Sequence, residues 1–486
     1  VVRFSILRRL LKASFSVAFR HPAKLFKTSD LIYSFCRFSF IQNVGSISYN
    51  KRKMNRKTKN YIPRVAEHSL KHRLNSSGCV IVTGPKACGK TTLCRQVSRS
   101  EVLLKTNRAI DLAKADPLSA LKGKTPHLID EWQKVPEIFN LIRNDLDEDY
   151  EFGKYILTGS TTPLDPSKIQ HNGAGRVSFL RLKPFSLYES GESNGIVSLS
   201  SLFNEPNKPI TSLYPEDNRF SLPDIAFLMC RGGWPISCKA KKEYAIAATA
   251  NYFHTLFSLE GESDDFAKFL EKKDIDLLRL ILKEASRNIS TQAKHSKRIK
   301  DILSSGERKT LDDETFNNYY FLLKKLFLIY DREARNKNLR SSVAVRVAPT
   351  IHFFDTSIAL AAIGIGPKDL LNDLNSFGFY FEDFAVRDLS IYRESIQGRI
   401  RHYRDSNGLE VDCLAQIPNG DYAAIEVKIY SPENIKKGIS SLTRFTSQRK
   451  ENGFSGPLFS AIITTHGPCY RSPEGIYIIP ITCLKD

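Results

Sequence analysis

Residues 78–92 constrain the fold more than any other part of the chain. They begin with an apolar, β-branched run at 79–82, which predicts a buried strand, and then fit the pattern G-x-x-x-x-G-K-[ST] from Gly84 to Thr91. Glycines in such a loop let backbone N–H groups point inward at an anion, and a helix that begins near Lys90 adds its positive end. The stretch therefore predicts a phosphate site, although a strand-turn-helix can also match this pattern by chance.

The pattern assigns separate roles to two side chains. We expect Lys90 to reach the β- and γ-phosphates of a nucleotide and the Thr91 hydroxyl to lie on Mg²⁺. The expected phosphate-binding residues are Gly84, Pro85, Lys86, Ala87, Cys88, Gly89, Lys90, Thr91 and Thr92.

Two carboxylates end the next informative stretch, residues 126–133. Asp130 follows a short apolar strand, forty residues after Lys90, and Glu131 follows it directly. In nucleotide-hydrolysing enzymes the first such carboxylate holds the Mg²⁺ shell, and the second orients or deprotonates the attacking water. The alternative is a pair of solvated acids where a strand meets a loop.

Further candidates follow along the chain. Residues 109–112 are expected to form a strand, and residues 154–160 a strand that ends in hydroxyls. Ser160 or Thr158 would contact the γ-phosphate or the water, unless these hydroxyls only stabilise a turn. Arg176 ends the polar loop 161–175 and is a candidate arginine finger; the alternative is an ordinary surface arginine.

Length and composition limit the class of protein. A chain of 486 residues predicts two or three domains, and the absence of a long apolar run argues against a membrane span. Nine cysteines without a C-x-x-C pair indicate reduced thiols in a cytoplasmic protein without a zinc site.

The positive charge is unevenly distributed. Residues 1–53 hold eleven of the Lys and Arg residues but only one acid, Asp30, so half of the net charge of +20 lies there. This segment is similar to an organellar transit peptide, or to translated sequence upstream of a start at Met54, which we favour. It is expected to be poorly packed. The remaining +10 permits a nucleic-acid partner without requiring one.

The middle of the chain is predicted to be helical. Clusters of Gly, Ser, Asn and Pro at 190–225 indicate a linker or insertion, and helical periodicity follows at 240–285 and 310–330. Between these helices lies a basic cluster. It predicts either a winged-helix-like element that contacts DNA phosphates or a packed helical connector with a solvated face; its members are Lys294, Lys297, Arg298 and Lys300.

Residues 409–417 and 422–430 alternate around Pro418-Asn419-Gly420 and predict a hairpin. A three-residue loop that pairs Ile417 with Asp421 is favoured over a two-residue turn, because a one-residue slip would mix polar and apolar side chains on both faces. The favoured register gathers three apolar pairs on one face: Val411 with Val427, Cys413 with Ile425, and Leu409 with Ile429.

The other face of this hairpin places Asp412 opposite Glu426, with Lys428 beside Glu426 and across from Glu410. Cross-strand Cβ atoms lie about 4.5–5.5 Å apart, so the two carboxylates of Asp412 and Glu426 could share a Mg²⁺ ion. Lys428 could then stabilise charge that develops on a phosphate. An ordinary half-exposed hairpin shows the same alternation.

The ordered motifs of the chain resemble one bacterial family, the AAA-type ATP-binding proteins with a C-terminal domain of unknown function. The resemblance runs from about Met54 to the end and rests on residues 84–92, 129–133, 157–160, 173–176, 184–189 and 231–235. It implies an α/β protein. A P-loop AAA-like ATPase core would span 54–215, a helical, winged-helix-like region 216–340, and a restriction-endonuclease-like α/β domain 341–486. Residues 1–53 depart from this pattern.

The hairpin constellation itself resembles the PD-(D/E)xK nucleases. Asp412, Glu426 and Lys428 match their D…E-x-K pattern, and Glu382, on a predicted helix at 379–389, matches their additional helix carboxylate.

Three functions fit these features. The first is an Mg²⁺-dependent ATPase in which Arg176 completes the site of a second copy of the chain in an oligomer. The second is a DNA-binding or DNA-cleaving module that the nucleotide switches. The third is a non-hydrolysing nucleotide switch in a protein assembly, with an inactive nuclease fold. ATP and Mg²⁺ are the expected cofactors, and no membrane partner is expected.

Overall fold

The computed structural model describes residues 61–160, 173–210, 220–257, 273–292, 294–334, 349–405 and 408–486. The chain divides into two units, Val1–Arg56 and Lys57–Asp486, and the described residues belong to the second. Residues 1–53, which we expected to be poorly packed, lie outside the described residues, as does most of the predicted loop 161–175. Among the described helices, none combines the length and the apolarity that a membrane crossing requires.

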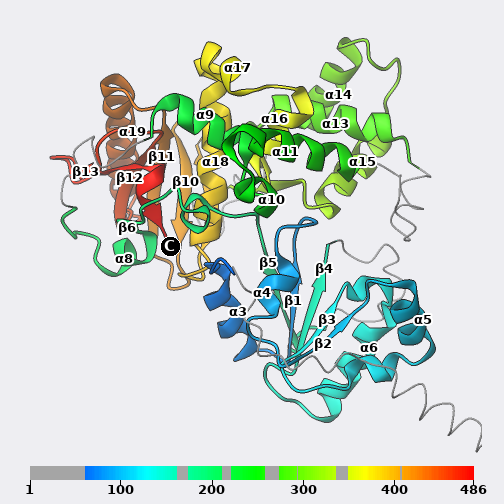
Figure 1. Ribbon diagram of the computed structural model, residues 1–486. Helices are drawn as coiled ribbons and strands as arrows, with labels where there is room; N and C mark the ends of the chain where they lie inside the picture. Colours follow the sequence, from blue (N-terminus) through cyan, green and yellow to red (C-terminus); the bar gives the residue numbers. More distant parts are fainter. Residues whose placement is uncertain are drawn as a thin grey trace, which may run out of the picture. The chain divides into compact units, whose positions relative to one another are not determined.

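The amino-terminal part of the described chain forms a five-stranded parallel sheet of order β2-β3-β4-β1-β5 (Figure 1). Alternate side chains of β1 enter two cores, which explains its continuous apolar run. Helices α3 and α4 contribute to one core, and α5 and α6 to the other. The bounds are α3 Ala66–Leu74, β1 Cys79–Thr83, α4 Lys90–Cys94, β2 Ser100–Leu103, α5 Asn107–Ala115, β3 His127–Asp130, α6 Glu137–Glu148, β4 Tyr155–Gly159 and β5 Val177–Arg181.

The strand predicted at residues 109–112 is wrong, because these residues lie in α5. Thr106 caps this helix, with its side chain accepting a hydrogen bond from the Ala109 amide at 3.3 Å. Ile110 and Ala113, three residues apart, pack against the sheet on one helical face. Four residues are too few to separate a strand from a helix by periodicity.

The predicted helical middle is confirmed for its described part, except that the helix predicted at 310–330 ends at Lys325 and residues 329–332 form a strand. In α15 the side chains of Phe316, Tyr320 and Leu323 form the expected buried stripe. The order α13-α14-α15 followed by the antiparallel pair β7-β8 is the one expected for a winged-helix-like region. The bounds are α9 Leu222–Arg231, α10 Pro235–Lys239, α11 Lys242–Leu256, α13 Ile275–Arg287, α14 His295–Ser304, α15 Asp313–Lys325, β7 Ile329–Arg332, β8 Thr350–Phe353, α16 Thr356–Ile363 and α17 Pro367–Asn372.

One member of the basic cluster in this region faces the core and not DNA. Arg298 is fully buried, and its Nη2 lies 2.5 Å from Oε2 of Glu284 on α13. Its guanidinium also lies 4.5 Å from the ring centroid of Tyr320. A phosphate contact by Arg298 is therefore excluded, and the packed helical connector describes this side chain.

Of the two predictions for residues 190–225, a linker or an insertion, the unstructured linker is wrong for the described part. Helix α7 (Leu187–Ser190) is followed by β6 (Val197–Ser198) and α8 (Leu199–Asn204). Strand β6 pairs in parallel with β15 (Leu484–Lys485), at the end of the chain. Leu199, Leu202 and Phe203 are buried, so their i, i+3, i+4 spacing was the helical signal in this polar stretch.

A second sheet, of order β13-β14-β12-β11-β10-β9, carries the predicted hairpin (Figure 1). Helices α18 and α19 contribute to different cores against it: Phe381 of α18 joins the core of Cys413 and Ile425, and Leu442 of α19 joins that of Leu414. The bounds are α18 Leu374–Tyr392, β9 Arg399–Arg404, β10 Glu410–Gln416, β11 Tyr422–Lys428, α19 Pro432–Glu451, β12 Phe459–Thr464, β13 Tyr470–Arg471 and β14 Tyr477–Pro480.

The predicted hairpin register is confirmed near the turn. Cys413 pairs with Ile425, and the Ile417 amide donates to the Asp421 carbonyl at 2.9 Å, as the three-residue loop requires. The prediction that all three apolar pairs share one face is wrong farther from the turn, because Val411 and Leu409 pack in the core on the other side of the sheet. The cause is a shift in the pairing of β10 with β9 between Val411 and Leu414, a bulge that inserts one residue and inverts the alternation.

Candidate functional site

The carboxyl ends of β1, β3 and β4 meet at one edge of the parallel sheet, and the phosphate loop begins there. Gly84 has φ +151°, and a Cβ atom on it would lie 2.2 Å from the Leu182 carbonyl oxygen. Ala87 and Gly89 also adopt positive φ values, of 62° and 101°. The loop therefore follows a path that requires glycine at its first position.

Lys90 lies inside this loop. It is 5% exposed, and its Nζ donates to the carbonyl oxygens of Gly84 and Pro85 at 2.9 and 2.8 Å. Among the described residues it has no carboxylate partner. A buried ammonium group that is held only by neutral carbonyls has charge left to satisfy, so the loop fits an anionic ligand.

Thr91 and Asp130 come together beside the loop. The Thr91 hydroxyl donates to Asp130 Oδ1 at 2.9 Å, and the Thr158 hydroxyl donates to the same oxygen. Asp130 is fully buried, and its Oδ2 lies 3.0 Å from Lys105 Nζ. A hydroxyl and a carboxylate in contact are the hard oxygen ligands that Mg²⁺ takes from proteins, while phosphates and water supply the others. The residues thus fit a Mg²⁺ ion that accompanies a nucleotide.

Glu131 has a strained backbone. Its φ is +61°, in the left-handed region that non-glycine residues seldom adopt, and its amide donates to the Thr158 carbonyl at 2.8 Å. Glu131 Oε2 accepts hydrogen bonds from Gln133 Nε2 at 2.5 Å and from Ser160 Oγ at 3.2 Å. Of the two candidate hydroxyls, Thr158 therefore contacts the first carboxylate and Ser160 the second.

Arg176 lies at the amino ends of the sheet strands, opposite to the ends where the phosphate loop begins. It precedes Val177, which pairs with Cys79 at the amino end of β1, four residues from Thr83. At about 3.3 Å per residue, this places its backbone about 13 Å from the start of the phosphate loop. Its guanidinium forms an ion pair with Asp147 of α6. The structure does not bring Arg176 to the phosphate loop of its own chain.

Two residues that the sequence did not indicate contact the loop from elsewhere. Arg64 Nη1 donates to the Cys88 carbonyl at 3.0 Å, and Arg64 Nε pairs with Glu189 Oε1 at 2.9 Å. Tyr252 of α11 donates through its hydroxyl to the Lys86 carbonyl at 2.9 Å. No pattern of neighbouring residues in the sequence predicts either contact, although Glu189 belongs to the motif at 184–189.

The motifs at 184–189 and 231–235 both contact one buried ionic group, formed by Asp355, Arg387 and Asp388. The Leu187 amide donates to Asp388 Oδ2 at 3.0 Å, and the Gly233 amide donates to Asp355 Oδ2 at 2.9 Å. Arg387 and Asp388 belong to α18, so this helix is hydrogen-bonded to the segment at 184–189, whose Glu189 pairs with Arg64 beside the phosphate loop.

The predicted hairpin residues form a second polar cluster. Lys428 Nζ lies 2.6 Å from Glu426 Oε2 and 3.2 Å from Asp412 Oδ2. Asp412 also accepts a hydrogen bond from the Val427 amide at 2.7 Å, which the bulge in β10 permits. Ser441 of α19 donates to Glu426 Oε1 at 3.2 Å. The structure therefore brings Asp412, Glu426 and Lys428 together.

Glu382 of α18 is electrostatically linked to this cluster. Burial and the nearby charge of Asp412 raise the pKa of the Glu382 carboxyl well above its usual value. Arg332 Nη2 lies 3.2 Å from Glu382 Oε1 and opposes this effect. Burial and Asp412 likewise raise the pKa of Glu426 to about 8, against the effect of Lys428. Within the described ranges, no three or more His, Cys, Asp or Glu side chains are arranged to hold a metal ion.

Models of three protein families match successive parts of the chain. An AAA domain matches residues 76–191, which include the phosphate loop, Asp130, Glu131 and Ser160. Two domains of unknown function, DUF8612 and DUF4143, match residues 222–369 and 377–484.

Two bacterial relatives match most of the chain. Uncharacterized protein Rv2008c of Mycobacterium tuberculosis and uncharacterized protein Mb2031c of Mycobacterium bovis are each 31% identical over 382 residues, which cover 78% of this chain and 76% of theirs.

Similar solved structures include the Walker-type ATPase PABY2304 of Pyrococcus abyssi, with a TM-score of 0.39 and 15% identity over 63% of this chain and 97% of that one. The ORC2 protein of Aeropyrum pernix, in ADPNP and ADP complexes, has a TM-score of 0.30 and 12% identity over 67% of this chain and 99% of that one. TM-scores this low carry no argument about the present chain. The AAA domain match and the identity to the two relatives show its family. The chain belongs to the same family as Rv2008c and Mb2031c, and it carries an AAA-type P-loop ATPase domain.

Proposed function

We propose that the chain binds ATP with Mg²⁺ at the loop of residues 84–92 and hydrolyses it. The observation that carries this proposal is the meeting of Lys90, Thr91, Asp130 and Glu131 at one edge of the parallel sheet, inside the match to the AAA domain. Parallel sheets bind ligands outside the carboxyl ends of their strands, which is where these four residues lie.

Each residue has a distinct task in this proposal. Backbone amides of the loop bind the phosphates, and the Lys90 ammonium group exchanges the carbonyls of Gly84 and Pro85 for phosphate oxygens. Thr91 and Asp130 would hold Mg²⁺, which when bound neutralises negative charge that develops on the phosphate oxygens.

Glu131 orients the attacking water and accepts its proton. Ser160 keeps the Glu131 carboxylate in place through their 3.2 Å hydrogen bond and senses the γ-phosphate. Arg176 would act only on the nucleotide of a second copy of the chain, because it lies at the far edge of its own sheet.

We further propose that nucleotide state is coupled to the C-terminal domain, which binds or cleaves DNA. Two neighbouring carboxylates, the buried Glu426 and the partly exposed Asp412, are joined by Lys428 and suit a phosphodiester site that would become active when a metal ion competes for the carboxylates. Helix α18 supplies the physical connection, since it carries both Glu382 and the Arg387–Asp388 pair that contacts the phosphate-loop domain.

The alternative is a nucleotide switch that does not hydrolyse ATP and whose nuclease-like fold is inactive. The observation that favours an inactive nuclease fold is the pairing of Lys428 with both Glu426 and Asp412, because this ammonium group balances one of the two carboxylate charges without a metal. It predicts ATP binding without phosphate release even though Glu131 is intact.

ATP turnover with Mg²⁺ separates these proposals. Lys90→Ala should lose binding and turnover, while Glu131→Gln should keep binding and lose turnover by about 10²–10⁴-fold. Lys114→Ala, on the exposed side of α5, is the matched control and should behave as wild type. Turnover by Lys90→Ala at the wild-type rate would refute the hydrolysis proposal.

Plasmid nicking in the presence of Mg²⁺ tests the nuclease version. We expect wild-type protein to nick DNA and Asp412→Ala to lose that activity. Equal nicking by both proteins, or no nicking in any nucleotide state, would remove cleavage from the proposal and leave DNA binding.

A further inference from the structure

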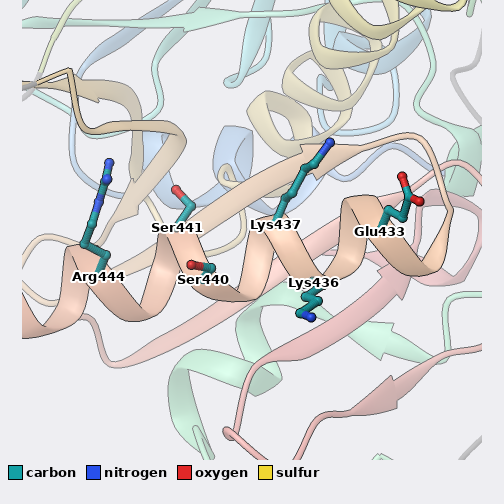
Figure 2. A pocket seen from close by; sticks show the side chains of 6 residues that line it. All are labelled: Glu433, Lys436, Lys437, Ser440, Ser441 and Arg444. Atoms are coloured by element: carbon teal, nitrogen blue, oxygen red, sulfur yellow. The ribbon is translucent and has the colours of Figure 1, made fainter.

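Helix α19 presents a groove beside the Asp412–Glu426–Lys428 cluster. The groove has a volume of about 510 Å³ and is lined by Glu433, Lys436, Lys437, Ser440, Ser441 and Arg444. Figure 2 shows Lys437, Ser441 and Arg444 extending from the same side of the helix. Their spacing of four and three residues explains this common direction.

The groove is positively charged and its cations are free. Lys436, Lys437 and Arg444 are exposed, and none of them has an ion-pair partner among the described residues. Glu433 is the only carboxylate in the lining. Three unpaired cations along two to three helical turns create a local positive potential that attracts anions.

The opposite side of α19 is fixed to the sheet. Ile435, Gly438, Leu442 and Phe445 are buried there. A Cβ atom on Gly438 would lie 2.7 Å from Ile462 Cδ1, so the helix packs closely on β12 at this point. The cations are therefore presented by a rigid element and not by a loop.

Ser441 joins the groove to the carboxylates. It lies on the helix between Lys437 and Arg444, and its hydroxyl donates to Glu426 Oε1 at 3.2 Å. A chain of phosphates that follows the groove would thus pass next to Glu426 and Lys428. Lys437 and Arg444 are separated by about 10.5 Å along the helix axis, or about three nucleotide steps of 3.4 Å, so they can reach different phosphates.

We propose that the α19 groove binds the phosphate backbone of DNA and guides it past the carboxylate cluster. This inference rests on the proposed DNA function of the C-terminal domain and assigns a surface to it. Lys437 and Arg444 contact phosphates on either side of Ser441, so binding depends on charge and not on base sequence. An anionic membrane is a poorer fit, because none of the large hydrophobic side chains exposed in the described ranges lies on α19.

Fluorescence anisotropy with a labelled 20-base-pair DNA duplex, without Mg²⁺, tests the groove. At 0.1 M salt, the double variant Lys437→Ala/Arg444→Ala should bind on the order of 50-fold more weakly, and the slope of log K against log salt should fall by about 1.8. Lys450→Ala, an exposed lysine near the end of the same helix, is the matched control and should keep wild-type affinity. The unfolding midpoint and ATP turnover of each variant verify that the fold is retained.

Two results would overturn the inference. If wild type and the double variant bind DNA equally well, the assignment of DNA binding to the α19 groove is wrong, and the proposed DNA function stands. If wild-type protein with normal ATP turnover does not bind the duplex, both the DNA function and the groove fail.

Discussion

Gly84 shows how far one residue decides the geometry of the phosphate loop. It needs a left-handed backbone and has no room for a side chain, because the Leu182 carbonyl lies against it. Gly84→Ala should therefore lower the free energy of unfolding by about 2–5 kcal/mol and abolish ATP binding. Chemical denaturation and nucleotide titration measure the two effects.

Gly175 supplies the control for this substitution. Its φ is +81°, and a Cβ atom there would have no neighbour within 4 Å. Gly175→Ala should therefore cost only the backbone strain, about 1 kcal/mol, and leave ATP binding intact. Equal losses in the two variants would show that the close approach at Gly84 does not matter.

Lys183 is a buried amine in an apolar setting. Its Nζ lies 4.1 Å from the ring centroid of Tyr330, with no hydrogen-bond partner among the described residues. Its pKa is lowered from 10.5 to about 7, chiefly by burial; Asp383 opposes this shift, and Arg393, Arg387 and Arg181 contribute to it.

This shift predicts a pH dependence of stability. Between pH 7 and pH 10.5 the native state holds a neutral amine while the unfolded chain is protonated, so the unfolded state binds more protons and stability rises with pH. Lys183→Met should be more stable than wild type by roughly 2–4 kcal/mol at pH 7, and the difference should shrink toward pH 10.5. Denaturation at several pH values measures it, and parallel curves for the two proteins would contradict the assignment.

At the scale of elements, the pair Arg298–Glu284 holds α14 against α13. Removing either partner leaves a buried charge, so Arg298→Met or Glu284→Leu alone should cost about 3–5 kcal/mol. The double variant should cost less than either single one, because no charge remains unpaired. A double-mutant cycle of unfolding free energies measures this coupling, and additive losses would contradict it.

The elements also show what local sequence could predict. The strand before the phosphate loop and the turn at Pro418–Gly420 were predictable, since each is determined by residues next to one another in sequence. The bulge in β10 was not, because it arises from pairing with β9, and it moves Val411 to the other face of the sheet. The short pattern at 109–112 failed for a similar reason: its helix depends on the cap at Thr106 and on packing against the sheet.

At the scale of the molecule, the proximity of the residues within each candidate site was predictable, and the contacts that connect the two candidate sites were not. Lys90, Asp130, Asp412 and Glu426 belong to motifs, whereas Arg64 and Tyr252 reach the loop through tertiary packing that leaves no pattern in the sequence. No sequence pattern predicts the contact of Asp388 with the Leu187 amide either, because the two residues are 201 positions apart in the sequence.

This connection predicts a long-range effect of nucleotide. A non-hydrolysable ATP analogue with Mg²⁺ should slow amide hydrogen exchange in residues 84–94 and also in α18, because Arg64, Glu189 and Leu187 link the loop to Asp388. Lys90→Ala should show neither change. Protection confined to residues 76–191 of the wild-type protein would mean that α18 does not sense the nucleotide.

Calorimetric titration of the whole chain with ATP and Mg²⁺ measures whether the loop of residues 84–92 is a nucleotide site. We expect saturable binding of one nucleotide per chain, which disappears when Mg²⁺-ATP is titrated into Lys90→Ala. The absence of binding by well-folded wild-type protein, or equal binding by Lys90→Ala, would contradict this expectation.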